Sequence, residues 1–243
     1  MDKYRLHYAP DNASLVIRLA LEEMGLSYDT ALVDRRAGAQ NGAAYRALNP
    51  TGLIPVLETP DGAIFETAAI LLWLGDTHPE TALVPAPDSP QRAAFLKWLF
   101  HASNTLHADL RMLFYPEKYI GAAPDDQRRL QAMLKVRIAT HLRNLDAACA
   151  TAPTLFIGPS ASDDRAGPSA LALYLACMMR WMALYPRNSD RSWFRLSDTP
   201  DLARLLSRLE TRASTVTAAI AEGLGPTPFT QPHLAQPPEG SAT

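Results

Sequence analysis

Glu66 and Thr67 place a carboxylate and a hydroxyl side by side at the start of a predicted helix. The apolar segment 68–74 follows directly, so we expect Thr67 to accept a hydrogen bond from a main-chain amide of the first turn. The remaining amides of a first helical turn form a binding site for an anion. The sequence therefore predicts that this helix start can hold a negatively charged group. The alternative is a helix that packs on the preceding segment and binds nothing.

A predicted hairpin leads into this helix. Two short apolar runs, 56–58 and 63–65, are separated by Thr-Pro-Asp-Gly. Pro60 sets the backbone torsion of the first turn position, and Gly62 can adopt the left-handed conformation that closes the turn. Pro55 has no amide hydrogen, so we expect it at the first residue of its strand, where no ladder bond is lost.

The motif Asn-Pro-x-Gly-x-Ile-Pro-x-Leu at 49–57, followed by Phe-Glu-Thr-x-Ala-Ile at 65–70, resembles the glutathione-binding half of cytosolic glutathione transferases. The resemblance implies that the turn of Leu53, Ile54 and Pro55 binds the cysteinyl part of glutathione through the main chain of Ile54, with a cis peptide bond before Pro55. It also implies that Glu66 and Thr67 hold the γ-glutamyl end.

A transferase of this kind must bring the thiol of glutathione to its thiolate, which is the nucleophile. A hydroxyl or amide donor aimed at the sulfur favours the anion, and a helix N-terminus adds a favourable field. The resemblance places such a donor between the first strand and the first helix, where the candidate catalytic residues are Tyr8, Asn12 and Ser14. Each has a structural alternative: packing for Tyr8, turn formation for Asn12 and helix capping for Ser14.

The segment 8–23 is most similar to the bacterial beta class, since Tyr8 and Ser14 fall on that class's tyrosine and serine. Ala13 occupies its cysteine position, so we do not expect mixed-disulfide chemistry with glutathione. The segment 98–107 resembles the helix that lines the cleft in the same class, with His107 on its cleft histidine and Phe100 in place of an asparagine. We expect His107 to contact glutathione or the second substrate, unless its role is only structural.

Two further parts of the site are predicted less directly. The glycine carboxylate of glutathione needs a cation or a polar partner, and by chain position this is Arg35, with Arg36 or Gln40 as alternatives. Apolar and aromatic side chains of the second half could line a site for an electrophile or could simply be core residues; they are Tyr115, Tyr119, Met178 and Trp181.

The elements that must position these residues divide the chain in two. The first part reads as strand 4–8, a helix that stops at Gly25, and strand 28–33, which implies a parallel pair, followed by an irregular connection, the hairpin and its helix. This order predicts an α/β thioredoxin-like N-terminal domain over 1–78. After a proline-rich linker at 79–90, the pattern predicts an all-α helical-bundle C-terminal domain over 91–224, which together form the glutathione transferase fold.

Two details of the helical part are open in the sequence. The buried anchor 155–157 precedes an apolar helix whose usual acidic cap position is Ala170, so Asp163, Asp164 or Ser169 must supply the cap. The final segment, 225–243, is rich in Pro, Gly, Gln and Ser, and we expect it to be mobile.

Composition excludes several classes of function. Lys and Arg number 23 against 25 Asp and Glu, so there is no basic surplus for nucleic acid and no charge run for a membrane surface. Cys149 and Cys177 lack CxxC spacing and are predicted as reduced core thiols, with no metal site. The charged N-terminus predicts no secretory segment, and the run 170–185, which contains Arg180, is short for a membrane span.

The resemblance thus implies a cytoplasmic, homodimeric glutathione transferase-like enzyme. It would use glutathione as co-substrate and add its thiolate to a small hydrophobic electrophile, in a detoxification role. One alternative is a non-catalytic module of the same fold that binds glutathione, a hydrophobic ligand or another protein. Another is a glutathione-dependent isomerase or reductase.

Overall fold

A four-stranded mixed sheet forms the base of the first part of the chain. The computed structural model describes residues 4–158 and 167–242. The strands lie in the order β2-β1-β3-β4, with β1 and β2 parallel and β3 antiparallel to both of its neighbours. Their bounds are β1 (Tyr4–Tyr8), β2 (Tyr28–Leu32), β3 (Val56–Thr59) and β4 (Gly62–Phe65). The predicted parallel pair and hairpin are both confirmed.

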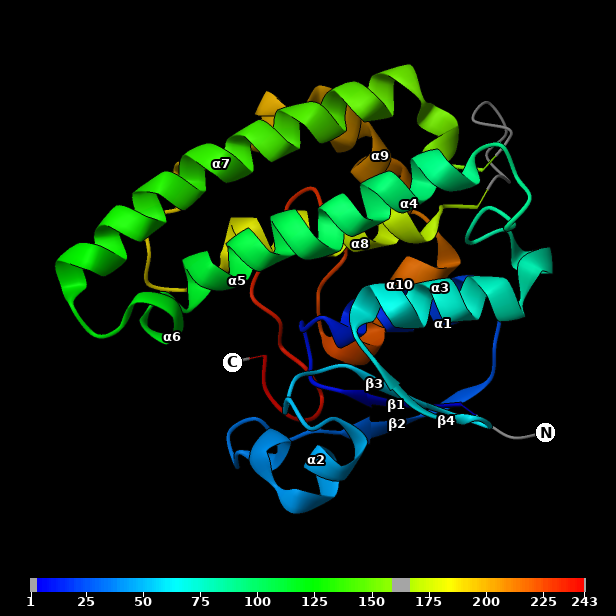
Figure 1. Cartoon of the computed structure of the whole chain (residues 1–243), viewed down its shortest axis with the longest axis horizontal. Helices are drawn as coiled ribbons and strands as arrows, with labels where there is room; N and C mark the ends of the chain where they lie inside the picture. The colour runs from blue at the N-terminus through cyan, green and yellow to red at the C-terminus, as the bar shows by residue number, and fades with distance from the viewer. Residues whose placement is uncertain (1–3, 159–166, 243) are drawn as a thin grey trace.

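Helices cover both faces of this sheet (Figure 1). Alternation along β1 turns Leu6 and Tyr8 toward the face covered by α1 (Ser14–Glu23) and α3 (Thr67–Thr77). The opposite face is covered by the short α2 (Ala43–Leu48), which follows a 3-10 turn at Ala39–Asn41. This arrangement is the predicted thioredoxin-like unit.

The second part of the chain is helical and encloses one central helix, α8 (Ala170–Leu184), which is buried on nearly all sides. Around it lie α4 (Arg92–His101), a π-helical segment (Ala102–His107), α5 (Ala108–Phe114), α6 (Glu117–Ile120), α7 (Pro124–Thr151), α9 (Pro200–Glu210) and α10 (Ala213–Glu222). Single 3-10 turns stand at Pro79–Thr81, Pro153–Leu155 and Leu196–Asp198. None of the helices within the described residues has the length and apolarity needed to cross a membrane.

Helix caps in this part come from side chains at a distance in sequence as well as nearby. Ser169 Oγ accepts a hydrogen bond from Ala172 N at 3.3 Å, so one of the three expected cap residues of α8 is confirmed. The other two, Asp163 and Asp164, lie outside the described residues. At the start of α9, Asp146 of α7 accepts hydrogen bonds from two main-chain amides, which joins these two helices at their ends.

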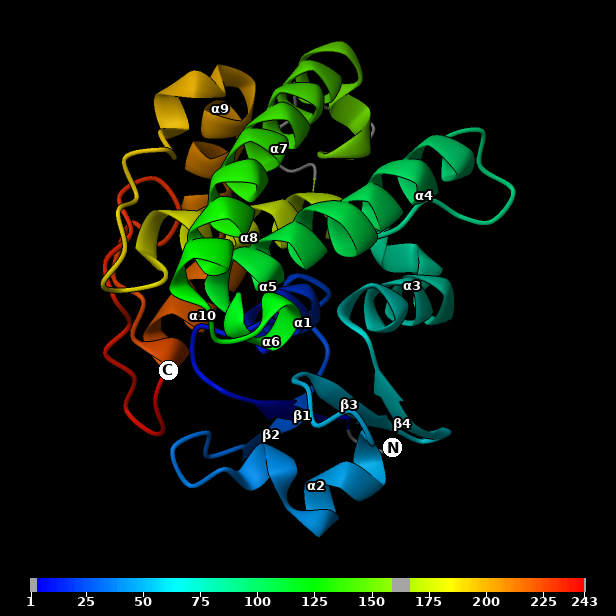
Figure 2. The same ribbon diagram turned by 60° about the vertical axis from the view of Figure 1, so that its left-hand side comes forward.

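The two parts share one continuous core because α1 packs against both α8 and α10 (Figure 2). The connection 79–90 is also packed: Leu83 and Val84 are buried, and the carbonyl of Leu83 accepts a hydrogen bond from Ala170 N at 2.8 Å. The first helix is therefore held from the sheet side and from the helical side at once.

The C-terminal segment differs from the expectation of a mobile tail. Residues 225–242 return along the molecule instead of projecting from it (Figure 1), and Phe229, Ala235 and Ala242 are buried. Glu210 accepts hydrogen bonds from the main-chain amides of Phe229 and Thr230, and buried Arg180 donates to the carbonyls of Pro228 and His233. Distant polar partners thus hold a segment that has few apolar side chains of its own.

Candidate active site

The strand register brings the three predicted site segments together. His7 pairs with Val56, and Val56 pairs with Phe65. β1 and β4 end, and β3 begins, at this same edge of the sheet. The connection between β1 and α1, the turn before β3 and the first residue of α3 therefore meet at one end of the sheet.

The turn before β3 presents an unused stretch of main chain. The Ile54–Pro55 peptide bond is cis. The carbonyl of Leu53 is occupied, because it accepts hydrogen bonds from the hydroxyl of Tyr45 and from Asn49 Nδ2, both at 2.8 Å. Within the part of the chain that the structure describes, the main-chain N–H and C=O of Ile54 take part in no hydrogen bond. They are free to pair with an extended ligand.

The start of α3 carries the predicted acid and hydroxyl, but the expected cap geometry differs. Thr67 is the first helical residue, and Glu66 precedes it with a φ of 72° and no side-chain capping bond. Glu66 is exposed, while Thr67 is buried beside the hydroxyl of Tyr174. An exposed carboxylate next to the first amides of an eleven-residue helix can hold the ammonium and the carboxylate of one zwitterionic group.

The structure separates the three candidate donors to a sulfur. Ser14 is fully buried and its hydroxyl donates to the carbonyl of Ala9 at 3.0 Å, so it points into the protein interior. Tyr8 is also buried, and its hydroxyl donates to Glu239. Burial and the nearby Glu239 raise the pKa of Tyr8, so it stays protonated.

Asn12 is the remaining donor and is only partly buried. Its side-chain oxygen accepts a hydrogen bond from Ala13 N at 2.8 Å, which fixes the carboxamide and leaves Nδ2 without a partner among the described residues. Asn12 lies two residues before the start of α1, so a group that accepts a hydrogen bond from its side chain also lies near the positive end of the helix dipole.

A buried charge network that the sequence did not indicate anchors this loop. Asp11 accepts two hydrogen bonds from Arg180, one from Trp181 Nε1 and one from the hydroxyl of Tyr185, all on or next to α8. The main-chain amide of Asp11 donates to Glu222 of α10 at 2.8 Å.

Glu222 in turn pairs with Arg18 of α1 at 2.7 Å. Burial raises the pKa of Glu222 to about 7, against the opposing effect of Arg18. The loop that carries Asn12 is consequently fixed to both helices that enclose it.

His107 faces the same region from the helical part. It lies at the end of the π-helical segment, its Nδ1 is 2.7 Å from the hydroxyl of Tyr174, and its ring is 5.5 Å from that of Trp181. Burial and the nearby Arg111 lower the pKa of His107 to about 4, so the imidazole is neutral near pH 7. Tyr174 bridges His107 and Thr67, and it is a contact that the sequence pattern did not single out.

The other predicted residues are more scattered. Arg35 is already engaged, with the carbonyl of Ala242 at 2.7 Å and the hydroxyl of Tyr115 at 3.3 Å. Gln40 has a buried side-chain oxygen without a partner among the described residues. The remaining candidates do not share one surface: Arg36 and Tyr119 are exposed, while Met178 and Trp181 are buried.

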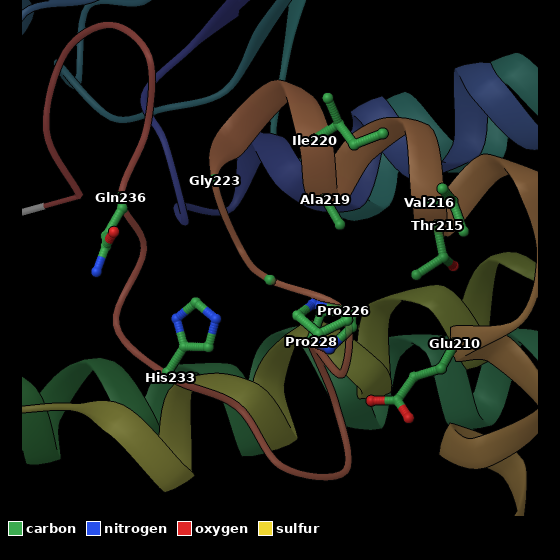
Figure 3. A pocket seen from close by; sticks show the side chains of 11 residues that line it. Glu210, Thr215, Val216, Ala219, Ile220, Gly223, Pro226, Pro228, His233 and Gln236 are labelled. Carbon is green, nitrogen blue, oxygen red and sulfur yellow. The ribbon is translucent and has the colours of Figure 1, made fainter.

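A separate hollow lies between α10 and the returning C-terminal segment (Figure 3). Its volume is about 550 Å³, and residues of α10 such as Ala219 and Ile220 face Pro226, Pro228 and His233 across it. It includes none of the predicted site residues. No group of three or more potential metal ligands is found within residues 4–158 and 167–242.

Sequence comparison finds similar proteins among the glutathione S-transferases. Residues 13–77 match the family model described as the N-terminal domain of glutathione S-transferase. The chain is 30% identical over 133 residues to glutathione S-transferase GstA of Escherichia coli O157:H7, a match that spans 54% of this chain and 66% of that protein. It is 26% identical over 226 residues to glutathione S-transferase GST-4.5 of Xanthomonas campestris, covering 90% of this chain and 99% of that protein.

A shorter match is to a maleylacetoacetate isomerase of Rhizobium meliloti. The two sequences are 35% identical over 92 residues, which cover 43% of the isomerase.

Solved structures extend the similarity to the whole fold. The ternary complex of BphK, a bacterial glutathione transferase, is 28% identical with a TM-score of 0.72 and covers 90% of this chain and 100% of that chain. A sphingomonad glutathione S-transferase complexed with glutathione is 26% identical with a TM-score of 0.70, covering 91% and 100%. The similarity therefore includes both the sheet and the helical part.

Proposed function

We propose that this chain, which is similar to glutathione S-transferases along 90% of its length, binds glutathione at the end of its sheet and adds the glutathione thiolate to a small hydrophobic electrophile. The observation that carries this proposal is the free main chain of Ile54, which lies between the loop of Asn12 and the start of α3. A tripeptide with a thiol in its middle residue fits these three features in order. Its backbone pairs with Ile54, its acidic end reaches Thr67, and its sulfur lies toward Asn12.

The zwitterionic γ-glutamyl end has complementary partners at the start of α3. Its ammonium pairs with exposed Glu66, and its carboxylate accepts hydrogen bonds from the main-chain amide of Thr67 and from the other first amides of the helix. The negative Glu66 therefore faces the ammonium of the ligand, and the positive end of the helix faces its carboxylate.

Asn12 is the group we assign to the sulfur. Its Nδ2–H donates to the thiolate, which lowers the thiol pKa because a hydrogen bond to the charged form favours that form. The thiol proton leaves to solvent, and the sulfur lone pair forms the bond to the electrophilic carbon while the two reactants are held together. With an enone the carbon–carbon π bond opens and the α-carbon takes a proton from solvent, whereas with an aryl halide the halide ion leaves. Neutral His107, hydrogen-bonded to Tyr174, closes the cleft from the helical side without placing a charge there.

The remaining properties are proposals carried over from the resemblance to the family. We propose a homodimer in the cytoplasm with a role in detoxification, built from a glutathione-binding domain over 1–78 and a helical domain over 91–224.

Two alternative functions have specific support. A non-catalytic glutathione-binding module is supported by the burial of Ser14 and the engagement of Tyr8, which leave Asn12 as the single candidate donor. A glutathione-dependent isomerase is supported by the partial similarity to maleylacetoacetate isomerase.

Binding and turnover separate these possibilities. Titration calorimetry with glutathione, followed by conjugation of an aryl halide, gives both signals for a transferase. Binding without conjugation supports the module, and isomerisation of maleylacetoacetate without conjugation supports the isomerase. If glutathione gives neither heat nor a thermal shift, the glutathione site itself is excluded.

A further inference from the structure

The hollow between α10 and the returning C-terminal segment has two fixed walls (Figure 3). Where they meet, Gln236 N donates to the carbonyl of Gly223 at 2.8 Å. Gly223 has a φ of 64°, and a Cβ atom there would lie 2.0 Å from the carbonyl oxygen of Gln236, so only a glycine permits this contact. Further along, Arg180 donates to the carbonyls of Pro228 and His233 at 3.0 and 2.9 Å. The segment is therefore anchored beside α10 with the hollow between them.

The side of α10 at this hollow carries exposed apolar side chains. Val216 and Ile220 line it with exposed fractions of 48% and 75%, and no other large apolar side chain among the described residues is as exposed as Ile220. Figure 3 shows the methyl group of Ala219 on the face of the helix that is turned toward Pro226 and Pro228. The volume of about 550 Å³ lies within the range of small-molecule sites. Apolar side chains left exposed around such a concave surface are typical of a binding site.

Glu210, the last residue of α9, supplies a carboxylate to the hollow. It accepts hydrogen bonds from the main-chain amides of Phe229 and Thr230 at 2.7 and 2.6 Å, and from the hydroxyl of Thr230 at 2.7 Å. All three donors are neutral, and a carboxylate has about four acceptor positions, so one position remains. Within residues 4–158 and 167–242, no Lys, Arg or His side chain forms an ion pair with Glu210. The charge of this carboxylate is therefore not balanced by a partner there.

The basic side chains on adjoining segments do not supply this partner. Arg180 holds its guanidinium on Asp11, and Arg212, just before α10, pairs with Glu23. Each of these arginines is already matched with a carboxylate, so neither balances Glu210. A negative charge beside an apolar surface favours a ligand that brings a positive charge together with an apolar body.

Two further polar side chains line the hollow. The hydroxyl oxygen of Thr215 is buried and has no hydrogen-bond partner among the described residues. Rotation about χ1 exchanges the hydroxyl and the methyl group of a threonine, so this oxygen can turn to a ligand in the hollow. His233 Nδ1 lies 3.0 Å from the carbonyl of Leu234 and donates to it, which leaves Nε2 as an acceptor in the neutral ring. Like Glu210, both groups can accept a hydrogen bond and suit a ligand that donates.

We infer that the hollow binds a small organic cation, with its ammonium group on Glu210 and its apolar body along α10. An ammonium has three donors and no acceptor, which matches the acceptors of the hollow. A neutral ligand would leave the charge of Glu210 unpaired, and an anion would be repelled by it. None of the residues assigned to glutathione lines this hollow, so the inference does not depend on the proposed function.

Three probes that share one ring and differ in charge test the site: 1-naphthylmethylammonium, 1-naphthylmethanol and 1-naphthoate. Calorimetry of the full chain near pH 7 is expected to show the ammonium binding at least about tenfold more tightly than the alcohol, the scale of a charged hydrogen bond. The anion is expected to bind most weakly. Equal affinity of the ammonium and the alcohol, or no heat with the ammonium at millimolar concentration, overturns the inference.

Glu210→Gln is expected to remove the preference for the ammonium, since glutamine keeps an oxygen for the amides of Phe229 and Thr230 but carries no charge. Glu117→Gln removes an exposed carboxylate of α6 and is the control, with an unchanged preference expected. A preference that persists in Glu210→Gln shows that Glu210 is not the partner of the cation and overturns the inference.

Two changes on α10 test the place of binding. Ala219→Trp fills the hollow and is expected to abolish binding of the ammonium. Ile220→Lys places a positive charge at the rim and is expected to weaken that binding about five- to tenfold. Because Ile220 is exposed, this variant keeps the test valid if the Ala219 variant does not fold. Val136→Lys on α7, where the wild-type side chain is 69% exposed, is its matched control. Equal affinity in Ile220→Lys and in the wild-type chain places the probe elsewhere and overturns the inference.

Two other occupants give different results. If saturating glutathione displaces the ammonium probe, the probe lies in the glutathione cleft, and the separate site is excluded. If Ile220→Lys dissociates an oligomer in sedimentation and Val136→Lys does not, this face of α10 is a protein interface and the inference is wrong. Failure of the chain to bind glutathione, by contrast, excludes the proposed function and leaves the three probe titrations to decide this inference.

Discussion

Arg180 Nε lies 2.8 Å from one carboxylate oxygen of Asp11 and Arg180 Nη2 lies 2.9 Å from the other, with both side chains fully buried. Asp11 directly precedes Asn12 and has a φ of 51°, a backbone conformation that non-glycine residues seldom adopt. The pair therefore holds the loop of the proposed sulfur donor on the central helix of the other half of the chain.

Asp11→Asn is expected to lower the free energy of unfolding by about 3–5 kcal/mol, because it leaves the guanidinium of Arg180 buried without a counter-charge. Urea unfolding measures this change. Asp125→Asn is the control, since Asp125 pairs with Arg128 on an exposed surface and its loss is expected to cost at most about 1 kcal/mol. Equal small losses in both variants would show that the buried pair does not anchor the loop.

Asn12→Ala is expected to raise the pKa of the bound glutathione thiol and to lower kcat/KM about 10- to 100-fold, because the thiolate loses its hydrogen-bond donor. The ultraviolet absorbance of the bound thiolate against pH reports the pKa directly. Ser14→Ala is the matched comparison: it removes the buried bond to Ala9 and is expected to lower stability while leaving the thiol pKa unchanged. If Ser14→Ala alone changes the thiol pKa, the donor to the sulfur is Ser14 and our assignment of Asn12 is wrong.

His107 is expected to titrate near pH 4 in the folded chain, which nuclear magnetic resonance of the imidazole protons can follow. Its pKa is lower in the folded state than the value of about 6.5 in an unfolded chain, so the unfolded state binds the extra proton between these values. The resulting stability is fully present above about pH 6.5 and is lost as pH falls toward 4, by roughly 3 kcal/mol.

His107→Gln removes the titrating group and is expected to flatten this part of the stability profile. A His107 pKa near 6.5 in the wild-type chain would contradict the burial of its ring between Tyr174 and Trp181.

Neither cysteine is expected to react with a thiol reagent in the folded protein. Burial raises the pKa of Cys149 to about 12 and that of fully buried Cys177 well above its ordinary value, so almost no thiolate is present near pH 7. Titration with an aromatic disulfide is expected to show two thiols in urea and almost none without it. Fast reaction of either thiol in the native chain would mean that the core around α8 opens readily.

Local patterns in the sequence were sufficient for the first part of the fold. Strand alternation predicted β1 and β2, and the Pro60 and Gly62 turn predicted the hairpin, because each of these signals comes from residues close together in the chain. The positions of the Leu53–Pro55 turn and of Glu66 and Thr67 were also predictable, because these residues directly precede and follow the hairpin.

The contacts that decide the roles of single residues could not be predicted in this way. Tyr8 meets Glu239, Asp11 meets Arg180, and Arg35 meets Ala242, each pair separated by more than 150 residues. A segment of prolines, glycines and small polar residues predicts mobility when read alone, since the polar groups that fix it lie elsewhere in the sequence. Ser14 likewise reads as an exposed cap or donor until the structure shows that Ala9 is its partner.

A crystal structure of the chain with glutathione bound tests the central claim most directly. The account predicts two hydrogen bonds between the cysteinyl main chain of glutathione and the N–H and C=O of Ile54, with the sulfur within about 3.5 Å of Asn12 Nδ2. Glutathione bound elsewhere, or bound at Ile54 with its sulfur turned away from Asn12, would contradict it.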